Sequence, residues 1–296
     1  MKRAQFWQTM RYELFLIPAL CFYTTFTIFP LLKTFFYSFT NFDGVTRHLK
    51  YVGFKNYLWV FRDQAMISSL SYTLFFTICT VTVVTMLAIP LALIFDANFK
   101  TKNIHKAIFF FPSIPSGLLL GYIWGFILSP ASTGAVNFFL TSILKIKPVF
   151  WLSDPLLAQI SSIIVAVWAG SGWHAMLYLA YLQSIPADIY EAAAIDGAGG
   201  WQRIRYITLP MLAPAMTISV MFLITGGLKV YEIPFALTQG GPGFSLYTIT
   251  QVILLRGISE LNYGRATAIS IIFFLIVLLF TFFQVNVMQK REEKMR

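Results

Sequence analysis

Polar and aromatic side chains interrupt two long apolar stretches of the sequence, and their chemistry suits a pocket for a small molecule. Aromatic rings can stack on the apolar face of a ligand, while hydroxyl, imidazole and charged groups hydrogen-bond its polar groups. The candidate substrate-binding residues are Trp168, Gly170, Trp173 and His174 in the first stretch, and Thr225, Gly226, Lys229, Tyr231 and Glu232 in the second.

Most of these residues also have a structural explanation. The tryptophans could pack against other helices or form an interfacial belt. His174 could make an interhelical hydrogen bond, which is commoner than a metal site for one histidine. Lys229 and Glu232, three residues apart, could pair on one helical face or face a cavity. Gly226 and Gly227 could interrupt a helix or let two helices pack closely.

The sequence offers no further catalytic or metal-binding chemistry. Its three histidines, His48, His105 and His174, are far apart, and no nucleophile motif or pair of carboxylates lies in an apolar stretch. None of the 18 glycines is followed by lysine, so the G-x-x-x-x-G-K-[ST] loop that cradles nucleotide phosphates is missing. We therefore predict no catalytic residue, no metal site and no cofactor bound by this chain.

The segment 184–210 separates two of the apolar stretches and is rich in helix signals. Pro186 suits a first helical turn, and Asp188 and Glu191 favour the positive end of that helix. Gly197 can adopt the left-handed conformation that ends a helix. The segment therefore predicts a short helix followed by a glycine turn.

A second short helix is expected after the glycine turn. Trp201, Ile204 and Ile207 recur at three-residue spacing, which predicts one apolar face before Leu209 and Pro210 open the next apolar stretch. In the first helix, the run of alanines at 192–194 gives a low surface that could sit in a groove of another protein. The alternative is an ordinary loop between two helices.

The residues of this segment resemble a known motif. Glu191-Ala192-Ala193, then Gly197, then Leu209-Pro210 stand at the spacing of the EAA motif of binding-protein-dependent ABC importer permeases. Four further segments resemble the carbohydrate-uptake branch, which includes sugar and glycerol-phosphate permeases, and the resemblance covers roughly residues 50 to 270. These segments are Leu182–Pro186, Ile195–Ala198, Val52–Tyr57 and Thr238–Pro242.

This resemblance implies a coupling role for the segment 184–210, whose first helix docks into a cleft of the ATPase in that family. Related sugar permeases contact their substrate in the two regions described above, so the resemblance also implies substrate contacts there in this chain. The ATPase-coupling residues implied are Glu191, Ala192, Ala193, Asp196, Gly197, Leu209 and Pro210.

The resemblance further implies the partners of the chain. They are two ABC ATPase subunits that use ATP and Mg, a second permease subunit expected to be a different chain, and an extracytoplasmic solute-binding protein. The implied fold is that of a type I ABC importer permease in a bacterial or archaeal cytoplasmic membrane. The implied activity is import of a sugar or oligosaccharide by alternating access, without enzymatic activity in this chain.

Composition independently indicates an integral membrane protein. Of 296 residues, 57% are hydrophobic and 11% are charged, against about 25% charged in soluble domains. The net charge of +10 comes from basic residues scattered among the apolar stretches. Lipid headgroups explain this distribution better than nucleic acid, which usually requires clustered basic and aromatic residues.

Six apolar intervals have the length of membrane-spanning helices, which predicts an all-α protein with six transmembrane helices. The third interval holds one span plus an uncharged outer loop. An even number of spans places both termini on one side, and the basic residues near both ends predict that this side is cytoplasmic. The intervals are 14–32, 64–95, 107–144, 155–187, 206–228 and 266–288.

We predict three segments along the chain. Residues 1–65 hold the first transmembrane helix and an outer loop, residues 66–290 form the core permease domain, and residues 291–296 form a cytoplasmic tail.

Two alternatives remain beside a sugar permease. A related permease could carry a non-sugar solute such as a glycerol-phosphate compound. A secondary transporter could also have kinked helices around a central site, but ion coupling usually requires an acidic residue within the spans, and 64–95 and 155–187 contain none. An enzyme or sensory module would need a catalytic cluster or a large soluble domain, which the sequence lacks.

Overall fold

The computed structural model describes residues 15–46, 49–129 and 134–295. Within these ranges the regular structure is helical, apart from one isolated antiparallel bridge between Thr40 and Tyr51. This agrees with the predicted all-α class. The side chains are described as far as residue 286.

Four of the described helices are long and apolar enough to cross a membrane without a break. The first, Leu16–Tyr37, comprises α2 (Leu16–Tyr23), the π turn η1 (Thr24–Ile28) and α3 (Phe29–Tyr37). It runs five residues past the predicted end at residue 32, because one lysine at position 33 does not stop a helix. The other three are α5 (Gln64–Asp96), α9 (Pro155–Leu182) and the apolar part of α16 (Tyr263–Met295).

Two further candidate spans are sharply bent. The first joins α6 (Lys102–Phe110) and η2 (Phe111–Ser113) to α7 (Gly117–Ile127), with a bend of 95°. Prolines 112 and 115 lie at this break and cannot donate the backbone hydrogen bonds of a continuous helix. If each bent pair is counted as one span, the described residues contain six, the number predicted from the sequence.

The second bent pair corrects a predicted boundary. Helical structure continues from Gly200 through Leu209 and Pro210 to Met211, and the chain then bends by 63° before α13 (Ala213–Leu228). We expected Leu209 and Pro210 to open the transmembrane helix directly. Pro214, in the first turn of α13, suits a helix start better than a helix interior, which explains why the break falls beyond Met211.

The chain contains two compact units, one of which joins the residues up to Asp63 with Ile253–Leu275. In this unit α4 (Lys55–Val60) is anchored by Asn56, whose side-chain amide donates to the carbonyls of Ser38 and Thr40 at 2.9 and 2.8 Å. The unit also contains the π turn η5 (Leu255–Ser259), the end of α15 (Ile249–Leu254) and the start of α16. The predicted division at residue 65 stays a prediction.

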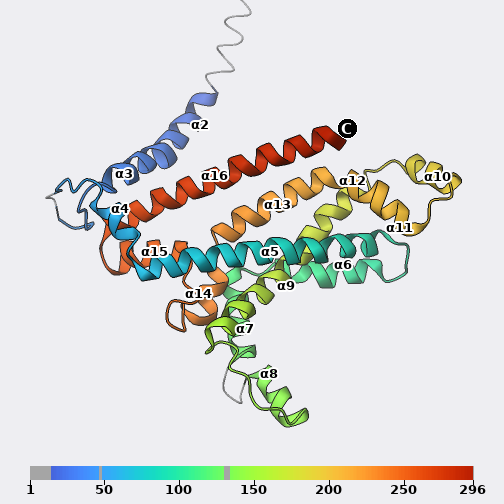
Figure 1. Ribbon diagram of the computed structural model, residues 1–296, viewed down its shortest axis with the longest axis horizontal. Coiled ribbons are helices and arrows are strands. Elements are labelled where there is room, and N and C mark those ends of the chain that lie inside the picture. Colours follow the sequence, from blue (N-terminus) through green and yellow to red (C-terminus); the bar gives the residue numbers. More distant parts are fainter. Residues whose placement is uncertain (1–14, 47–48, 130–133, 296) are drawn as a thin grey trace, which may run out of the picture. The chain divides into compact units, whose positions relative to one another are not determined.

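The second unit joins Gln64–Val252 with the helix from Ile276 onward. Its core is made by α5, α9 and α13, which lie side by side (Figure 1). Small residues permit this close packing: a Cβ added at Gly227 of α13 would lie 2.9 Å from Oγ1 of Thr77 on α5. Tyr72 and Tyr178 are among the largest side chains that are fully buried there.

Shorter helices complete the second unit. α14 (Glu232–Thr238) packs against α7, while α8 (Ala135–Phe138) and the π turn η3 (Phe139–Ile143) lie in the segment predicted as an outer loop. Between α9 and α13 the chain forms α10 (Ala187–Ile195), α11 (Gly200–Arg203), the π turn η4 (Ile204–Thr208) and α12 (Leu209–Met211).

Candidate functional site

The first candidate site is the segment between α9 and α13, where α10 forms as predicted. Pro186 is the residue before the first turn of α10, one position earlier than expected, because its backbone (ψ 135°) is extended. Asp188 lies in the first turn, where its charge favours the helix. Glu191 is the fifth residue of α10, so the prediction that it supports the positive end of the helix is wrong.

Gly197 ends this helix in the predicted left-handed conformation, with a φ of +76°. The amide of Gly197 donates to the carbonyl of Ala194 at 3.1 Å, and the amide of Ala198 donates to that of Ala193 at 2.9 Å. These two bonds form a Schellman motif, which satisfies carbonyls that the end of a helix leaves free. The turn after α10 is therefore fixed by backbone geometry.

The second short helix differs from the expected pattern. It is formed by α11, η4 and α12, and its π turn breaks the three-residue spacing on which the apolar face was predicted. Trp201 is 70% exposed, whereas Ile204 and Ile207 are half-buried. The prediction of one common face for these three residues is therefore wrong, and Trp201 instead lies on the surface of the unit.

Side-chain bonds hold the two short helices together as a hairpin (residues 187–211), which we call the coupling hairpin after the role that its sequence motif predicts. The hydroxyls of Tyr190 and Thr208 are 3.0 Å apart, and Nε of Arg203 donates to the carbonyl of Ala198 at 2.9 Å. Within the hairpin, the side chain of Ala193 is buried, while those of Ala192 and Glu191 are exposed. The hairpin therefore presents small and charged side chains on a firmly held backbone.

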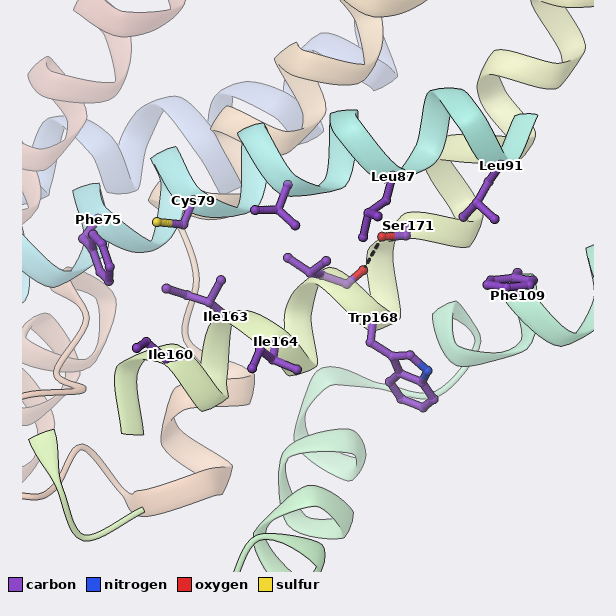
Figure 2. A pocket seen from close by; sticks show the side chains of 12 residues that line it. Phe75, Cys79, Leu87, Leu91, Phe109, Ile160, Ile163, Ile164, Trp168 and Ser171 are labelled. Atoms are coloured by element: carbon purple, nitrogen blue, oxygen red, sulfur yellow. Dashed lines mark hydrogen bonds between the residues drawn. The ribbon is translucent and has the colours of Figure 1, made fainter. Parts of the chain in front are cut away.

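Trp168 on α9 has a partner on the bent span. Its ring and that of Trp124 on α7 pack edge to face, with centroids 5.4 Å apart. Trp168 also lines a groove of about 590 Å³ between α5 and α9, where Figure 2 shows Phe75, Leu87 and Leu91 directed from α5 toward α9 and the Trp168 ring pointing away from α5. Apart from Ser171, the lining residues are hydrophobic, aromatic or cysteine, and the Ser171 hydroxyl donates to the carbonyl of Val167.

This groove does not resemble a sugar site. A sugar requires several free donors and acceptors beside an aromatic face, and the groove offers Trp168 with almost no free polar group. Its surface suits lipid chains or another apolar helix. Trp168 can therefore contact a substrate only with the part of its ring outside the groove.

The other residues of the α9 set face different directions. Trp168 and Trp173 are five positions apart, which is roughly 140° around a helix, so they do not share one face. Trp173 packs edge to face with Phe222 of α13, with centroids 5.6 Å apart. Gly170 lies on the side of α9 that faces α5, where a Cβ would be 3.9 Å from Cγ2 of Val84.

His174 makes the interhelical hydrogen bond that we weighed against a ligand role. Its Nδ1 lies 2.7 Å from the hydroxyl oxygen of Ser219 on α13, and His174 is 7% exposed. No group of metal-ligating residues occurs in the part of the chain that the structure describes. His174 is therefore held between two helices.

Gly226 and Gly227 of α13 were expected either to interrupt the helix or to allow close helix packing. α13 continues through Gly226 and Gly227 to Leu228, so they do not interrupt the helix. Gly227 packs against Thr77, while Gly226 is exposed, with no atom within 4 Å of an added Cβ. Close packing is thus correct for Gly227. Gly226 and the half-buried Thr225 leave this end of α13 accessible.

Lys229 and Glu232 do not share a helical face, because α13 ends at Leu228 and Glu232 begins α14. The two ion pairs found among the described residues both involve Arg256, and neither contains Lys229 or Glu232. Glu232 instead lies over Gly117 at the start of α7, where an added Cβ would be 2.6 Å from its Oε2. A carboxylate is favoured at this positive helix end. Tyr231, the third candidate here, stacks on Phe235.

Sequence reasoning missed a glycine stripe on α7. Gly117, Gly121 and Gly125 recur every four residues and face α14; a Cβ at Gly121 would lie 2.5 Å from Cβ of Ala236 and 3.0 Å from the carbonyl oxygen of Ile233. The spacing of small residues was a visible signal of close helix packing. Ser219, the partner of His174, had no such signal.

Taken together, the long apolar helices, the two bent spans and the hairpin between α9 and α13 define a multi-pass helical membrane protein built as a transporter subunit. Residues 84–293 match the family described as the binding-protein-dependent transport system inner membrane component. The chain belongs to this family. It is a permease subunit of an ABC transporter and not an enzyme.

Two curated relatives match nearly the whole chain. The probable starch degradation products transport system permease protein AmyD of Thermoanaerobacterium thermosulfurigenes is 30% identical over 299 residues, covering 99% of each chain. The multiple sugar-binding transport system permease protein MsmF of Streptococcus mutans is 33% identical over 281 residues, covering 94% of this chain and 95% of the relative.

The fold is also similar to that of a solved transporter. A chain in the crystal structure of a bacterial alginate ABC transporter, in complex with alginate pentasaccharide-bound periplasmic protein, superposes with a TM-score of 0.86. The match covers 98% of this chain and 97% of the other, at 23% identity. At that identity the similarity concerns the fold.

Proposed function

We propose that this permease imports a sugar or oligosaccharide by alternating access, driven by ATP hydrolysis in separate ATPase subunits. The coupling hairpin carries the proposal, because it joins two candidate membrane-crossing elements and exposes Glu191, Ala192 and Trp201 on a backbone fixed at Gly197. The carbohydrate assignment is supported by the relatives, whose names refer to starch degradation products and to multiple sugars.

We further propose six spans with both termini and the coupling hairpin in the cytoplasm. Basic residues flank the apolar helices at both ends of the chain, with Lys2, Arg3 and Arg11 at one end and Lys290, Arg291 and Lys294 at the other. Such residues are retained on the cytoplasmic side of a membrane. The membrane is that of a bacterium or an archaeon.

The proposed complex contains two copies of an ABC ATPase, a second permease of different sequence and an extracytoplasmic solute-binding protein. ATP and Mg bind to the ATPases. The coupling residues proposed within the hairpin are Glu191, Ala192, Ala193, Asp196, Gly197, Leu209 and Pro210.

Substrate contacts are proposed where candidate side chains remain accessible. Trp168 and Trp173 are 44% and 39% exposed, and Gly226 and Lys229 are exposed near the end of α13. These residues could offer ring faces, backbone and a donor to a sugar passing through the assembled complex. Thr225, Tyr231 and Glu232 lie along the same end of α13 and the start of α14.

Transport by the purified complex in proteoliposomes tests the proposal. The two permeases and the ATPase of the host would be reconstituted with the binding protein and offered labelled maltose, maltotriose, lactose or glycerol 3-phosphate, with ATP on the side of the ATPase. ATP-dependent uptake of one of the sugars is expected. Uptake of glycerol 3-phosphate alone would contradict the carbohydrate assignment, and uptake driven by an ion gradient without ATP would contradict the importer.

Variants in the same assay test the proposed contacts. Trp173→Ala should lower sugar uptake while leaving the complex assembled, and Trp173→Phe, which keeps an aromatic face, should retain more uptake. If Trp168, Trp173 and Lys229 can all be replaced by alanine at full activity, this substrate region is wrong.

A further inference from the structure

Three buried polar side chains and one half-buried one meet in the second unit, on three different helices. His174 and Tyr178 lie one turn apart on α9, Ser219 lies on α13 and Thr85 lies on α5. His174 and Ser219 are bonded at 2.7 Å, and Ser219 and Tyr178 are both 0% exposed. The hydroxyl of Tyr178 faces the side chains of Ser219 and Thr85.

Two hydroxyls of this cluster lack a hydrogen bond of normal geometry, namely those of Tyr178 and Thr85. A buried hydroxyl without a partner is destabilising, and more so between membrane helices, where solvent cannot compensate it. Phenylalanine would fill the place of Tyr178 without this cost. A second arrangement in which the Tyr178 hydroxyl bonds Ser219 with normal geometry would remove this cost.

The cluster lies close to the coupling hairpin. Tyr178 precedes Pro186 by eight residues, or about 12 Å at ~1.5 Å per helical residue. Ser219 follows the bend at Leu212 by seven residues on the other side of the hairpin. The cluster thus joins α9, which leads into the hairpin, to α13, which follows it. A movement of the hairpin that displaces either helix would change the distance between His174 and Ser219.

We propose that Ser219 exchanges its hydrogen bond between His174 and Tyr178 during the transport cycle, and that this exchange sets the position of α13 along α9. A serine hydroxyl can both donate and accept, so it suits either partner. The two partners are one helical turn apart, and one-turn shifts between packed helices are a known kind of conformational step. His174, Tyr178 and Ser219 are then positioning residues. The inference rests on the proposed function, because it requires a transport cycle.

Tyr178→Phe in the reconstituted complex separates this role from simple packing. Removing an unpaired buried hydroxyl should leave thermal stability unchanged or higher, yet the exchange predicts about three- to tenfold less sugar transported per ATP hydrolysed, the range expected for one interhelical hydrogen bond. Tyr72→Phe is the matched control, because the Tyr72 hydroxyl is bonded to that of Ser162 at 2.7 Å. That control should lower stability and leave transport per ATP unchanged.

A double-mutant cycle with His174→Ala and Ser219→Ala, with His174→Asn as the conservative variant, supplies a second measurement. The exchange predicts that each lowers transport per ATP, that asparagine preserves more than alanine at position 174, and that the effects of the two alanine variants are not additive. A changed KM for the sugar with normal transport per ATP would make His174 a substrate contact and overturn the inference. Wild-type transport per ATP in both Tyr178→Phe and Ser219→Ala would overturn it as well.

These outcomes are distinct from failure of the proposed function. If the wild-type complex transports none of the sugars, the carbohydrate assignment fails before any variant is compared. If the wild type transports and the variants behave like it, only the hydrogen-bond exchange is wrong.

Discussion

Gly197 has a positive φ and open space around it, so its conformation rather than its size restricts what can replace it. We predict that Gly197→Ala weakens the coupling hairpin by about 1–2 kcal/mol, the cost of the left-handed conformation for a residue with a Cβ. ATPase co-purification and ATP-driven uptake should fall together. Gly197→Asn should retain more activity, because asparagine tolerates this conformation.

Gly200 is the matched control for this prediction. It lies in the same hairpin with equally open space, but at the start of α11 with no positive φ. Gly200→Ala should be neutral or slightly stabilising, since alanine favours helices. Equal loss of ATPase binding in Gly197→Ala and Gly200→Ala would mean that the backbone conformation of Gly197 is unimportant.

Asp63 and Glu260 both pair with Arg256 in the first unit, but their contributions to stability should differ because they are buried to different degrees. Asp63 is 5% exposed and accepts two bonds from the guanidinium, at 2.9 and 3.0 Å, whereas Glu260 is 35% exposed. Asp63→Asn should lower the free energy of unfolding by about 3 kcal/mol, because it leaves the largely buried guanidinium of Arg256 with only the more exposed Glu260 as a counter-charge. Glu260→Gln should cost at most about 0.5 kcal/mol. Thermal denaturation in detergent measures both, and similar shifts would contradict this difference.

At the scale of elements, the sequence predicted the helices but not the size of their bends. Apolar intervals located the four unbroken candidate spans and the two bent pairs, because a bilayer requires about 20 apolar residues in each span. The 95° bend before Gly117 and the bend at Leu212 depend on how neighbouring helices accommodate the prolines, which one sequence does not specify. For the same reason the partner of His174 was unpredictable, whereas the left-handed turn at Gly197 followed from local chemistry alone.

The contact between α7 and α14 gives a prediction at this scale. Gly121→Ala would place a Cβ 2.5 Å from Ala236 and should force the two helices apart, at a cost of about 1–3 kcal/mol. Gly125→Ala is the control on the same face, because its nearest neighbours would be 3.8 and 3.9 Å away. Thermal stability and sugar uptake should fall only in Gly121→Ala. Equal behaviour of the two variants would show that α14 does not pack closely on α7.

At the scale of the whole molecule, much of the surface is apolar, which suits a chain that works within lipid and beside other subunits. The first span is 0% buried within the chain itself, against 50% for α9. Composition and motifs could predict the membrane location and the kinds of partner, but the substrate depends on groups that converge only in the assembled complex.

The proposed orientation predicts which parts of the chain face the cytoplasm. In a variant whose two cysteines, Cys21 and Cys79, are replaced by alanine, single cysteines would be introduced as Val45→Cys and Asp188→Cys, both at exposed positions. A membrane-impermeant maleimide should label Val45→Cys in intact cells, and Asp188→Cys only after the membrane is opened. The basic ends of the chain favour cytoplasmic termini, and the four proposed spans that precede the coupling hairpin then place it on the same side. Labelling of Asp188→Cys in intact cells would place the hairpin where no ATPase can reach it, and both the topology and the coupling role would be wrong.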